Sequence, residues 1–441
     1  MKASTFAKAV TMAAAASLIF TGCATGGGGG GNSATDGKAV WNDPTASLEG
    51  VTLTFGGGTV ADPGLTQVMD AFTEATGAKF DRIAYPDPYE QSLLTKVAVG
   101  DMPDLAAWQP TTSQLTTLQP SKNLLSLDDA PWLDDLDPAV KDVTGFIGDT
   151  RYAALVTSPS VMGVYYNKAL FAQYGITEEP ANWDEFIADA QSIKDQGGVP
   201  FYEAGGDQWP TQWWPQVQLA EAAQDGLWER VNTNEEQFTS PTILDTITEY
   251  QSLVEAGLFN ADIKTGTVID QANAVLTGET AMAVQVNALL LQMQSVSDTE
   301  TIDANVGWFP ISQNGNVATS IPDNKNGVVA FRTGDAKQEA ASAQFLNFWM
   351  TTGYADYIEA ANAVSIKPDV ESPSGVPAVA KLISSSLGTS VGSMQSLAVA
   401  NPDLYINLAN MLQGTQTPEQ VADATQKQFA QLAQAQGIDG F

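Results

Sequence analysis

The chain has 441 residues, of which 44% are hydrophobic and 16% charged, so it can bury a core of two or three domains. This composition excludes a small disulfide scaffold and a disordered chain. A formal net charge of −32 excludes a nucleic-acid partner, because such binding requires Lys and Arg to neutralise phosphates. The sequence contains no histidine, which excludes Ser-His and Cys-His catalysis and imidazole metal sites. We expect no metal and no cofactor.

The N-terminus has the pattern of a secretory leader. Two lysines precede the apolar run Ala9–Phe20, which is too short to span a bilayer, and the small residues Thr21 and Gly22 follow. We therefore predict a signal peptide over residues 1–22. The only cysteine, Cys23, comes directly after this pair and resembles the lipidated residue of a bacterial lipobox. That resemblance implies lipid attachment at Cys23.

A glycine run follows the cysteine. Gly26–Gly31 is typical of a flexible linker, so residues 23–47 are predicted to be a tether and the folded body to begin near Leu48.

Beyond the tether, strand and helix patterns alternate. An alternating run at residues 51–55 is followed by Asp62-Pro63, an N-cap with proline in the first turn, and Gly77 is a helix stop. Further strands are expected at residues 78–83 and 105–108, with a helix between them. This βαβαβ order predicts a parallel sheet. N-cap patterns at Asn182 and Thr417 predict two later helices.

Four of the ten tryptophans lie within twenty residues, at positions 209, 213, 214 and 228. Residues 205–210 have the Gly and Pro content of a loop. Two interpretations remain open at this point: a satellite core under the loop, or a platform on which the apolar face of a pyranose stacks.

Two catalytic motifs are weaker. Residues 388–392 match G-x-S-x-G, but without histidine no base can activate the serine, so a Ser/Gly-rich loop is favoured. Asp134, Asp135 and Asp137 could suggest a glycosidase pair or a calcium site, yet neighbours in sequence do not face one another across a substrate. A solvated acidic turn is the preferred interpretation.

Several motifs, in order along the chain, resemble the extracellular carbohydrate-binding proteins of ABC importers, of the maltose-binding type. They are GDMPDL at residues 100–105, YYNKALF at 165–171, NWDEF at 182–186, GETAM at 278–282 and the helix pattern at 340–349. Together they cover nearly the whole mature chain.

The resemblance implies a two-lobed α/β clamp in which each lobe is a mostly parallel sheet flanked by helices. The chain would cross between lobes near residues 154–163, 309–311 and 350–354. Lobe 1 would then comprise residues 48–155 and 310–353, and lobe 2 residues 156–309 and 354–441.

The resemblance also implies which side chains face the ligand. Trp108 ranks first, because the family places a stacking or cleft-lining tryptophan there, and Asp62 also has its N-cap role. The full set of expected ligand-binding residues is Thr59, Asp62, Trp108, Gln109, Asp207, Trp209, Trp214, Asn287, Asp323, Asn401 and Asp403.

The expected function is capture of an oligosaccharide outside the cell by hinge closure, followed by delivery to an ABC permease. We expect a lipid-anchored monomer that performs no chemical step. The alternatives are a carboxylate-dependent lipoprotein glycosidase and a glycan sensor or adhesin.

Overall fold

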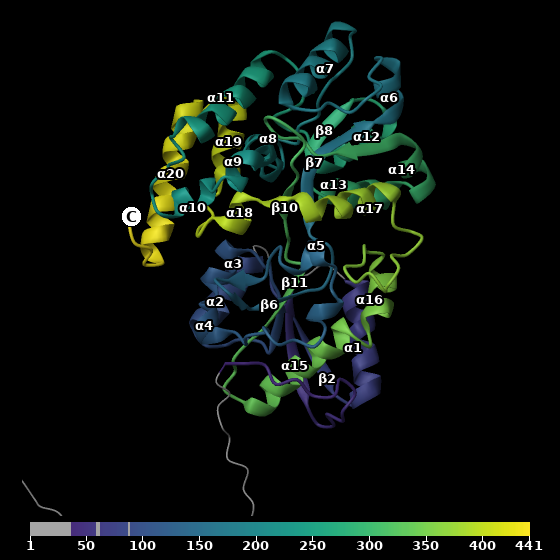
Figure 1. The fold of residues 1–441 in the computed structure, drawn as a ribbon, viewed down its shortest axis with the longest axis vertical. Coiled ribbons are helices and arrows are strands. Elements are labelled where there is room, and N and C mark those ends of the chain that lie inside the picture. Colours follow the sequence, from purple (N-terminus) through teal and green to yellow (C-terminus); the bar gives the residue numbers. More distant parts are fainter. Residues whose placement is uncertain (1–36, 59–61, 87–88) are drawn as a thin grey trace, which may run out of the picture. The chain divides into compact units, whose positions relative to one another are not determined.

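The computed structural model describes residues 37–58, 62–86 and 89–441. Within them the chain forms two main sheets, each flanked by helices (Figure 1). The predicted signal peptide, Cys23 and Thr59 lie outside the described residues.

The first sheet has the strand order β2-β1-β3-β11-β6. Its strands are β1 (Thr52–Gly57), β2 (Lys79–Ala84), β3 (Leu105–Ala107), β6 (Ala153–Leu155) and β11 (Gly327–Ala330). The helices beside it include α1 (Pro63–Thr76), α2 (Tyr89–Ala98), α15 (Ala336–Met350) and α16 (Tyr354–Ala361). We call this sheet with its helices the first lobe.

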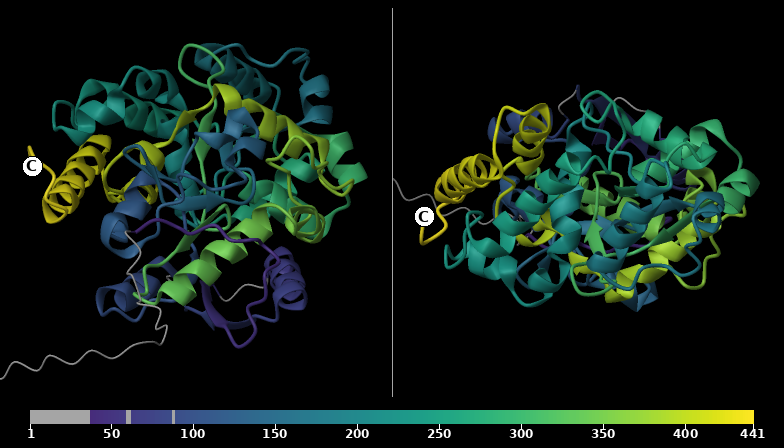
Figure 2. Two further views of the ribbon diagram at one scale, coloured as in Figure 1. Left: turned by 60° about the horizontal axis from the view of Figure 1, so that its bottom comes forward. Right: turned by 90° about the horizontal axis from the view of Figure 1, so that it is seen from above.

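The second sheet has the order β12-β10-β7-β8, and β9 also pairs with β7. These strands are β7 (Ser160–Asn167), β8 (Met282–Gln285), β9 (Val306–Phe309), β10 (Thr319–Ile321) and β12 (Val391–Gly392). Its helices include α7 (Trp183–Asp195), α11 (Pro241–Glu255), α12 (Val268–Thr277), α13 (Ala288–Val296), α17 (Ala378–Ser385), α19 (Leu404–Gln413) and α20 (Pro418–Ala435). This second lobe ends with α19 packed beside α20, both yellow in Figure 2.

Shorter elements fill the connections. They are α3 (Thr112–Thr117), α4 (Pro120–Asn123), α5 (Pro138–Lys141), β4 (Phe146–Ile147), β5 (Thr150–Arg151), α6 (Lys168–Gln173), α8 (Trp213–Gln218), α9 (Ala220–Gln224), α10 (Leu227–Asn232), α14 (Thr299–Asn305), α18 (Met394–Leu397) and short 3-10 turns at Leu133–Asp135, Trp209–Gln212 and Ser386–Thr389.

The helix ends follow the sequence signals. Asp62 Oδ1 accepts a hydrogen bond from the Leu65 N–H, and Gly77 ends α1 with a left-handed φ of 77°. Asn182 caps α7, and Thr417 forms a complete capping box with Gln420 on α20. The predicted βαβαβ unit is confirmed, because β1 pairs in parallel with both β2 and β3.

Both sheets are mixed rather than mostly parallel. Strand β11 runs antiparallel to its neighbours β3 and β6, and β7 runs antiparallel to β8, β9 and β10. The physical reason is the connectivity. A strand that enters a sheet from the other lobe needs no crossover helix and can pair in the opposite direction.

Three segments cross between the lobes: residues 156–159 between β6 and β7, 322–326 between β10 and β11, and 362–377 between α16 and α17. The second segment follows β10, which pairs with β7 of the second sheet, and the third follows α16, which packs on α1 and α15 of the first lobe.

The folded body also begins earlier than Leu48. Lys38 forms a β-bridge with Ser126, and Trp41 packs edge-on against Trp132 at 5.1 Å between ring centroids. Two side chains of α15, Gln344 and Asn347, donate hydrogen bonds to the backbone of residues 42–46. Removing the large apolar surface of Trp41 from water stabilises the packing of this segment on the folded body.

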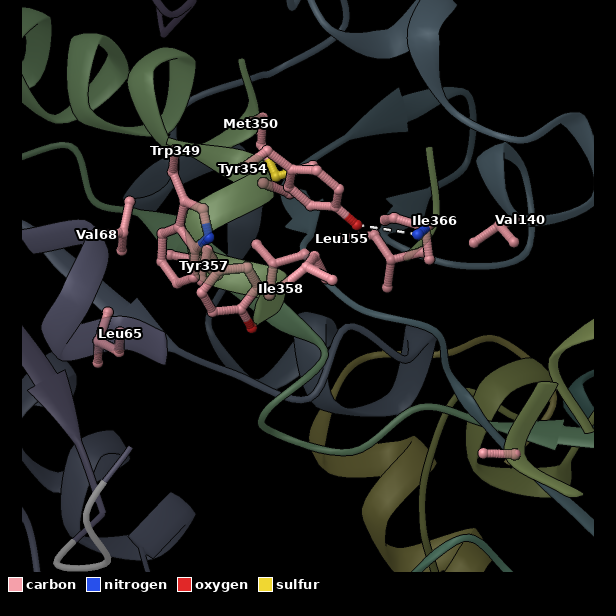
Figure 3. Close-up of a cluster of buried hydrophobic side chains, with 14 of the residues drawn as sticks. Leu65, Val68, Val140, Leu155, Trp349, Met350, Tyr354, Tyr357, Ile358 and Ile366 are labelled. Carbon is pink, nitrogen blue, oxygen red and sulfur yellow. Dashed lines mark hydrogen bonds between the residues drawn. The ribbon is translucent and has the colours of Figure 1, made fainter. Parts of the chain in front are cut away.

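The core of the first lobe includes the contact of α16 with α1 and α15. Figure 3 shows Trp349, Tyr354 and Tyr357 in this cluster, with the Tyr354 hydroxyl oxygen accepting a hydrogen bond from the backbone N–H of Ile366. Gly64 allows the close approach, since a Cβ there would lie 2.8 Å from both Tyr357 Cε2 and Ala361 Cβ. Glycine at position 64 is therefore a packing requirement of this contact.

Candidate ligand site

A cavity of about 230 Å³ lies where the three crossing segments meet α13 and α16, and we call it the crossing pocket. Its polar lining includes Asp62, Ser158, Asn287, Asp323, Lys325, Asn326 and Tyr357. Three of the expected ligand-binding residues, Asp62, Asn287 and Asp323, are thus brought to one place from distant parts of the sequence.

The two carboxylates of the pocket are held by backbone N–H groups. Asp62 Oδ1 accepts from Leu65 N at 2.9 Å, and Asp323 Oδ1 accepts from Lys325 N at 2.8 Å. Neither forms an ion pair with a Lys or Arg among the described residues. These backbone bonds fix the position of each carboxylate.

Asp323 is exposed, yet protein atoms surround its carboxyl within the pocket. This desolvation raises the pKa of Asp323 above its usual range, while the Lys325 backbone N–H and ammonium oppose the rise. The nearby Glu90 carboxylate adds to it. The pocket therefore concentrates negative charge in a partly water-depleted space.

Tyr357 forms one wall of the pocket. The residue is only 3% exposed, and its hydroxyl has no hydrogen-bond partner among the described residues. In Figure 3 this hydroxyl points away from the apolar cluster that holds the ring. Burial raises the pKa of Tyr357, and the charges of Asp62 and Asp323 raise it further. The hydroxyl therefore lies within electrostatic range of both carboxylates.

Two asparagines fix the crossing segments around the cavity. Asn326 Nδ2 donates to Thr157 Oγ1 at 2.9 Å and to the Ser158 carbonyl at 3.0 Å. Asn287 Oδ1 accepts from Val161 N at 3.2 Å. The first two crossing segments are therefore joined directly by side-chain hydrogen bonds.

The opposite wall is aliphatic. It contains Leu290 and Leu291 of α13 together with Val376, Pro377 and Ala380 of the third crossing and α17. Leu291 is 56% exposed, so its apolar side chain is accessible in the cavity lining. A concave surface with an apolar wall and a few fixed polar groups is typical of a small-molecule site.

Trp108, the first-ranked expectation, has a different environment. Its side chain is fully buried among Tyr89, Leu115 and other core residues, and its Nε1 donates to the Gln114 carbonyl at 3.1 Å. The ring has no open face on which a sugar could stack in this structure. The neighbouring Gln109 donates to the Pro322 carbonyl at 2.8 Å, so it contacts the second crossing from outside the pocket.

The other expected aromatic residues also lie outside the crossing pocket. Trp214 is fully buried and stacks on Tyr250 at 5.7 Å, whereas Trp209 is half-buried and meets Trp213 edge-on at 5.9 Å. Asp207 is exposed, and its Oδ2 accepts from Val268 N at the start of α12. The satellite-core interpretation thus holds for Trp214.

Asn401 and Asp403 lie before α19. Asp403 has a left-handed φ of 48°. Its Oδ2 accepts from Gln428 Nε2 at 2.9 Å, and its backbone N–H donates to Asn401 Oδ1 at 3.3 Å. Both residues are engaged in local hydrogen bonds and do not line the crossing pocket. Their role in ligand binding stays a prediction.

Sequence reasoning missed Tyr357 and Leu291. Tyr357 belongs to a helix whose apolar residues recur every three to four positions, so its periodicity indicates a core residue and gives no sign of a free hydroxyl. Leu291 sits on the nearly all-apolar run of α13. Asn362 ends α16 with a left-handed φ of 46°, at the start of the third crossing. Asparagine tolerates this conformation, so its presence is a local signal for the end of the helix but not for the pocket.

The described residues contain no group of three or more carboxylate or thiol side chains placed to hold a metal ion. None of their helices is both long and apolar enough to cross a bilayer.

A sequence profile described as bacterial extracellular solute-binding protein matches residues 56–356. The chain belongs to this family. A binding protein from Brucella abortus is 25% identical to this solute-binding protein over 260 residues, 54% of this chain and 61% of that relative. The match thus spans less than two thirds of the relative.

Two further likenesses concern proteins named for sugars. A multiple sugar-binding protein from Streptococcus mutans is 27% identical over 127 residues, 29% of this chain and 30% of that protein. The solved structure of a chitin oligosaccharide binding protein superposes on this solute-binding protein with a TM-score of 0.71 and 20% identity, covering 87% of this chain and 99% of the other. The superposition establishes the two-lobed fold.

Proposed function

We propose that this solute-binding protein captures an oligosaccharide outside the cell and delivers it to the permease of an ABC importer, without a chemical step. The observation that carries the proposal is the crossing pocket, which combines unpartnered polar groups with an aliphatic wall. Sugars present hydroxyls and apolar ring faces together, so they match such a lining. The sugar-binding relative supports the same ligand class.

The proposed mechanism is closure of the two lobes on the ligand. Asp62 and Tyr357 come from the first lobe, whereas Asn287 and Leu291 come from α13 of the second, and all three crossing segments line the same cavity. A ligand that contacts both walls only when the lobes approach would shift the population toward the closed form. We propose that this closed form is the one the permease recognises.

The proposed lobe boundaries follow the strand pairing. The first lobe would comprise residues 38–155 and 327–361. The second would comprise residues 160–321 and 378–441, and the three crossing segments would act as hinges. For the N-terminus we propose removal of residues 1–22, lipid attachment at Cys23 and a monomer on the outer face of the cell membrane.

The acidic turn of Asp134, Asp135 and Asp137 gives little support to the glycosidase alternative. Asp134 pairs with Lys141 at 2.9 Å, Asp135 pairs with Lys367 at 3.1 Å, and Asp137 caps α5 through the Ala139 N–H. These three carboxylates therefore have structural partners. A sensor or adhesin would bind the sugar in the same way as the proposed transport protein but would not deliver it to a permease.

A glycan array followed by calorimetry on the purified secreted protein tests the proposal. We expect a saccharide to bind, to shrink the radius of gyration in solution scattering, and to be recovered unaltered after long incubation. Absence of any saccharide ligand would overturn the proposal, and hydrolysis that copurifies with the protein would favour the glycosidase. Import of the bound sugar should stop when the adjacent permease is deleted, whereas a sensor would leave import unchanged.

The anchor is tested separately with Cys23→Ser, because lipidation needs the thiol and stable anchoring needs more than one acyl chain. The variant should leave the membrane fraction while keeping its sugar affinity. Continued partition with membranes would show that Cys23 is not the attachment site.

A further inference from the structure

We propose that the sugar held in the crossing pocket carries a protonated amine, which sits between the carboxylates of Asp62 and Asp323 beside the Tyr357 hydroxyl. This inference rests on the proposed function and specifies the chemical class of its ligand.

The first observation is that the two carboxylates lack a cationic partner. Each has one oxygen held by a backbone N–H, and no Lys or Arg lies within ion-pair distance of either among the described residues. A carboxylate in the lining of a cavity has fewer water partners than one on an open surface, so a positive charge on a ligand would stabilise it. A ligand that brings an ammonium group would satisfy both at once.

The second and independent observation is the Tyr357 hydroxyl. The residue is 3% exposed and belongs to the cavity lining, and its hydroxyl forms no hydrogen bond within the described residues. In Figure 3 the hydroxyl points away from the apolar cluster that holds the ring. A phenolic oxygen can accept a hydrogen bond as well as donate one. An ammonium has three donors, which matches two carboxylate oxygens and this one phenolic oxygen.

The charge balance of the pocket points the same way. Glu90 adds a third carboxylate within electrostatic range of Asp323, and the only lysine in the lining is Lys325. Lys325 is exposed, and its ammonium forms no ion pair with either pocket carboxylate. The net charge of −32 would also raise the local concentration of a cationic ligand at the pocket.

The aliphatic wall completes the assignment. Leu290, Leu291 and Pro377 line the same cavity as the two carboxylates, so a sugar ring can contact them while an amine on the ring reaches the carboxylates. A simple inorganic cation would gain nothing from this apolar side.

Calorimetry with matched trisaccharides tests the inference. The probes are the glucosamine trimer, its fully N-acetylated counterpart with the same backbone, and a panel of neutral di- to tetrasaccharides that includes raffinose. At about pH 6 the amines are mostly protonated. We expect the glucosamine trimer to bind at least about tenfold more tightly than the N-acetylated trimer, the ratio typical of one charge-assisted hydrogen bond. Raising NaCl from about 0.05 M to about 0.5 M should weaken only the amine sugar.

The variant Asp323→Asn isolates the charge, because the amide oxygen can still accept from Lys325 N. It should lower the affinity for the glucosamine trimer about tenfold or more and change neutral-sugar affinity less than about threefold. Asp70→Asn, on the exposed face of α1, is the matched control and should change neither. Melting temperatures of both variants verify that they fold.

Each outcome has a definite meaning. Equal or tighter binding of a neutral sugar, or loss of neutral and amine sugars alike in Asp323→Asn, would overturn the amine assignment and leave sugar capture standing. Binding of no saccharide at all would overturn the proposed function itself.

Discussion

The tryptophan-rich region around residues 209–214 and the crossing pocket form a clear contrast. The first is dense in packed aromatic rings. Trp213 Nε1 donates to Gln285 Oε1 at 2.7 Å and Tyr250 donates to Glu203 at 3.0 Å, whereas the buried Trp214 Nε1 has no partner among the described residues. The second has a single aromatic side chain, yet it contains an unpartnered hydroxyl and two carboxylates without a cation. Aromatic density marks the core here, and polar groups that share a cavity with aliphatic side chains mark the candidate site.

The largest expected effect concerns the aromatic region. Trp214→Ala removes a fully buried ring that stacks on Tyr250, so we expect the free energy of unfolding to fall by about 3–5 kcal/mol in urea titrations. The folded fraction should keep its ligand affinity. The half-buried Trp209 is the comparison, and its replacement by Ala should cost less. A tenfold loss of ligand affinity with an unchanged unfolding midpoint would contradict the core assignment and indicate that Trp214 contacts the ligand.

A second prediction uses the buried Glu203 in the same region. Burial raises its pKa to about 7 from 4.5, while hydrogen bonds from Tyr250 and Ala204 oppose the rise. Between these values the folded state holds the proton more tightly than the unfolded state, so this group's stabilising effect is fully present below about pH 4.5 and is lost as pH rises to about 7.

The measurement is the difference in unfolding free energy between the parent and Glu203→Gln across that range. The variant should lose this slope, which amounts to up to about 3 kcal/mol. The exposed Glu255→Gln on α11 is the control and should keep the parent profile. A pH-independent difference would show that Glu203 does not titrate in this window.

Features that depend on neighbouring residues could be predicted from the sequence, whereas the environments of single side chains in the core and the pocket could not. Caps at Asp62, Asn182 and Thr417 could be predicted locally, because each depends on residues a few positions apart. The parallel pairing of β1 could be predicted from the βαβαβ order of the elements. Trp108 could not be placed, because its enclosure depends on side chains from several distant elements. Tyr357 has the periodicity of a core residue, and only tertiary contacts leave its hydroxyl without a partner.

A third prediction acts on the pocket wall. Gly64→Ala would place a methyl group 2.8 Å from the Tyr357 ring and force α1 and α16 apart, at about 1–3 kcal/mol of unfolding free energy. Displacing Tyr357 should also weaken ligand binding. Gly57→Ala is the matched control, because a Cβ there meets no atom within 4 Å. Equal stability of the two variants would contradict the close contact.

The smallest expected effect separates the two roles of Asp62. Asp62→Ala removes the N-cap bond to Leu65 and should lower the unfolding free energy by about 1 kcal/mol, whereas Asp62→Asn retains the cap. Thermal melts give the stability and calorimetry with the bound sugar gives the affinity. If Asp62→Asn binds the amine sugar as well as the parent does, Asp62 acts only as a cap.

The contacts of residues 38–46 have a mechanical consequence. Because Gln344 and Asn347 fasten this segment to α15, whatever precedes Gly37 joins the molecule on the first lobe. A membrane anchor at Cys23 would therefore connect to the first lobe alone. Closure would then move the second lobe relative to the cell surface.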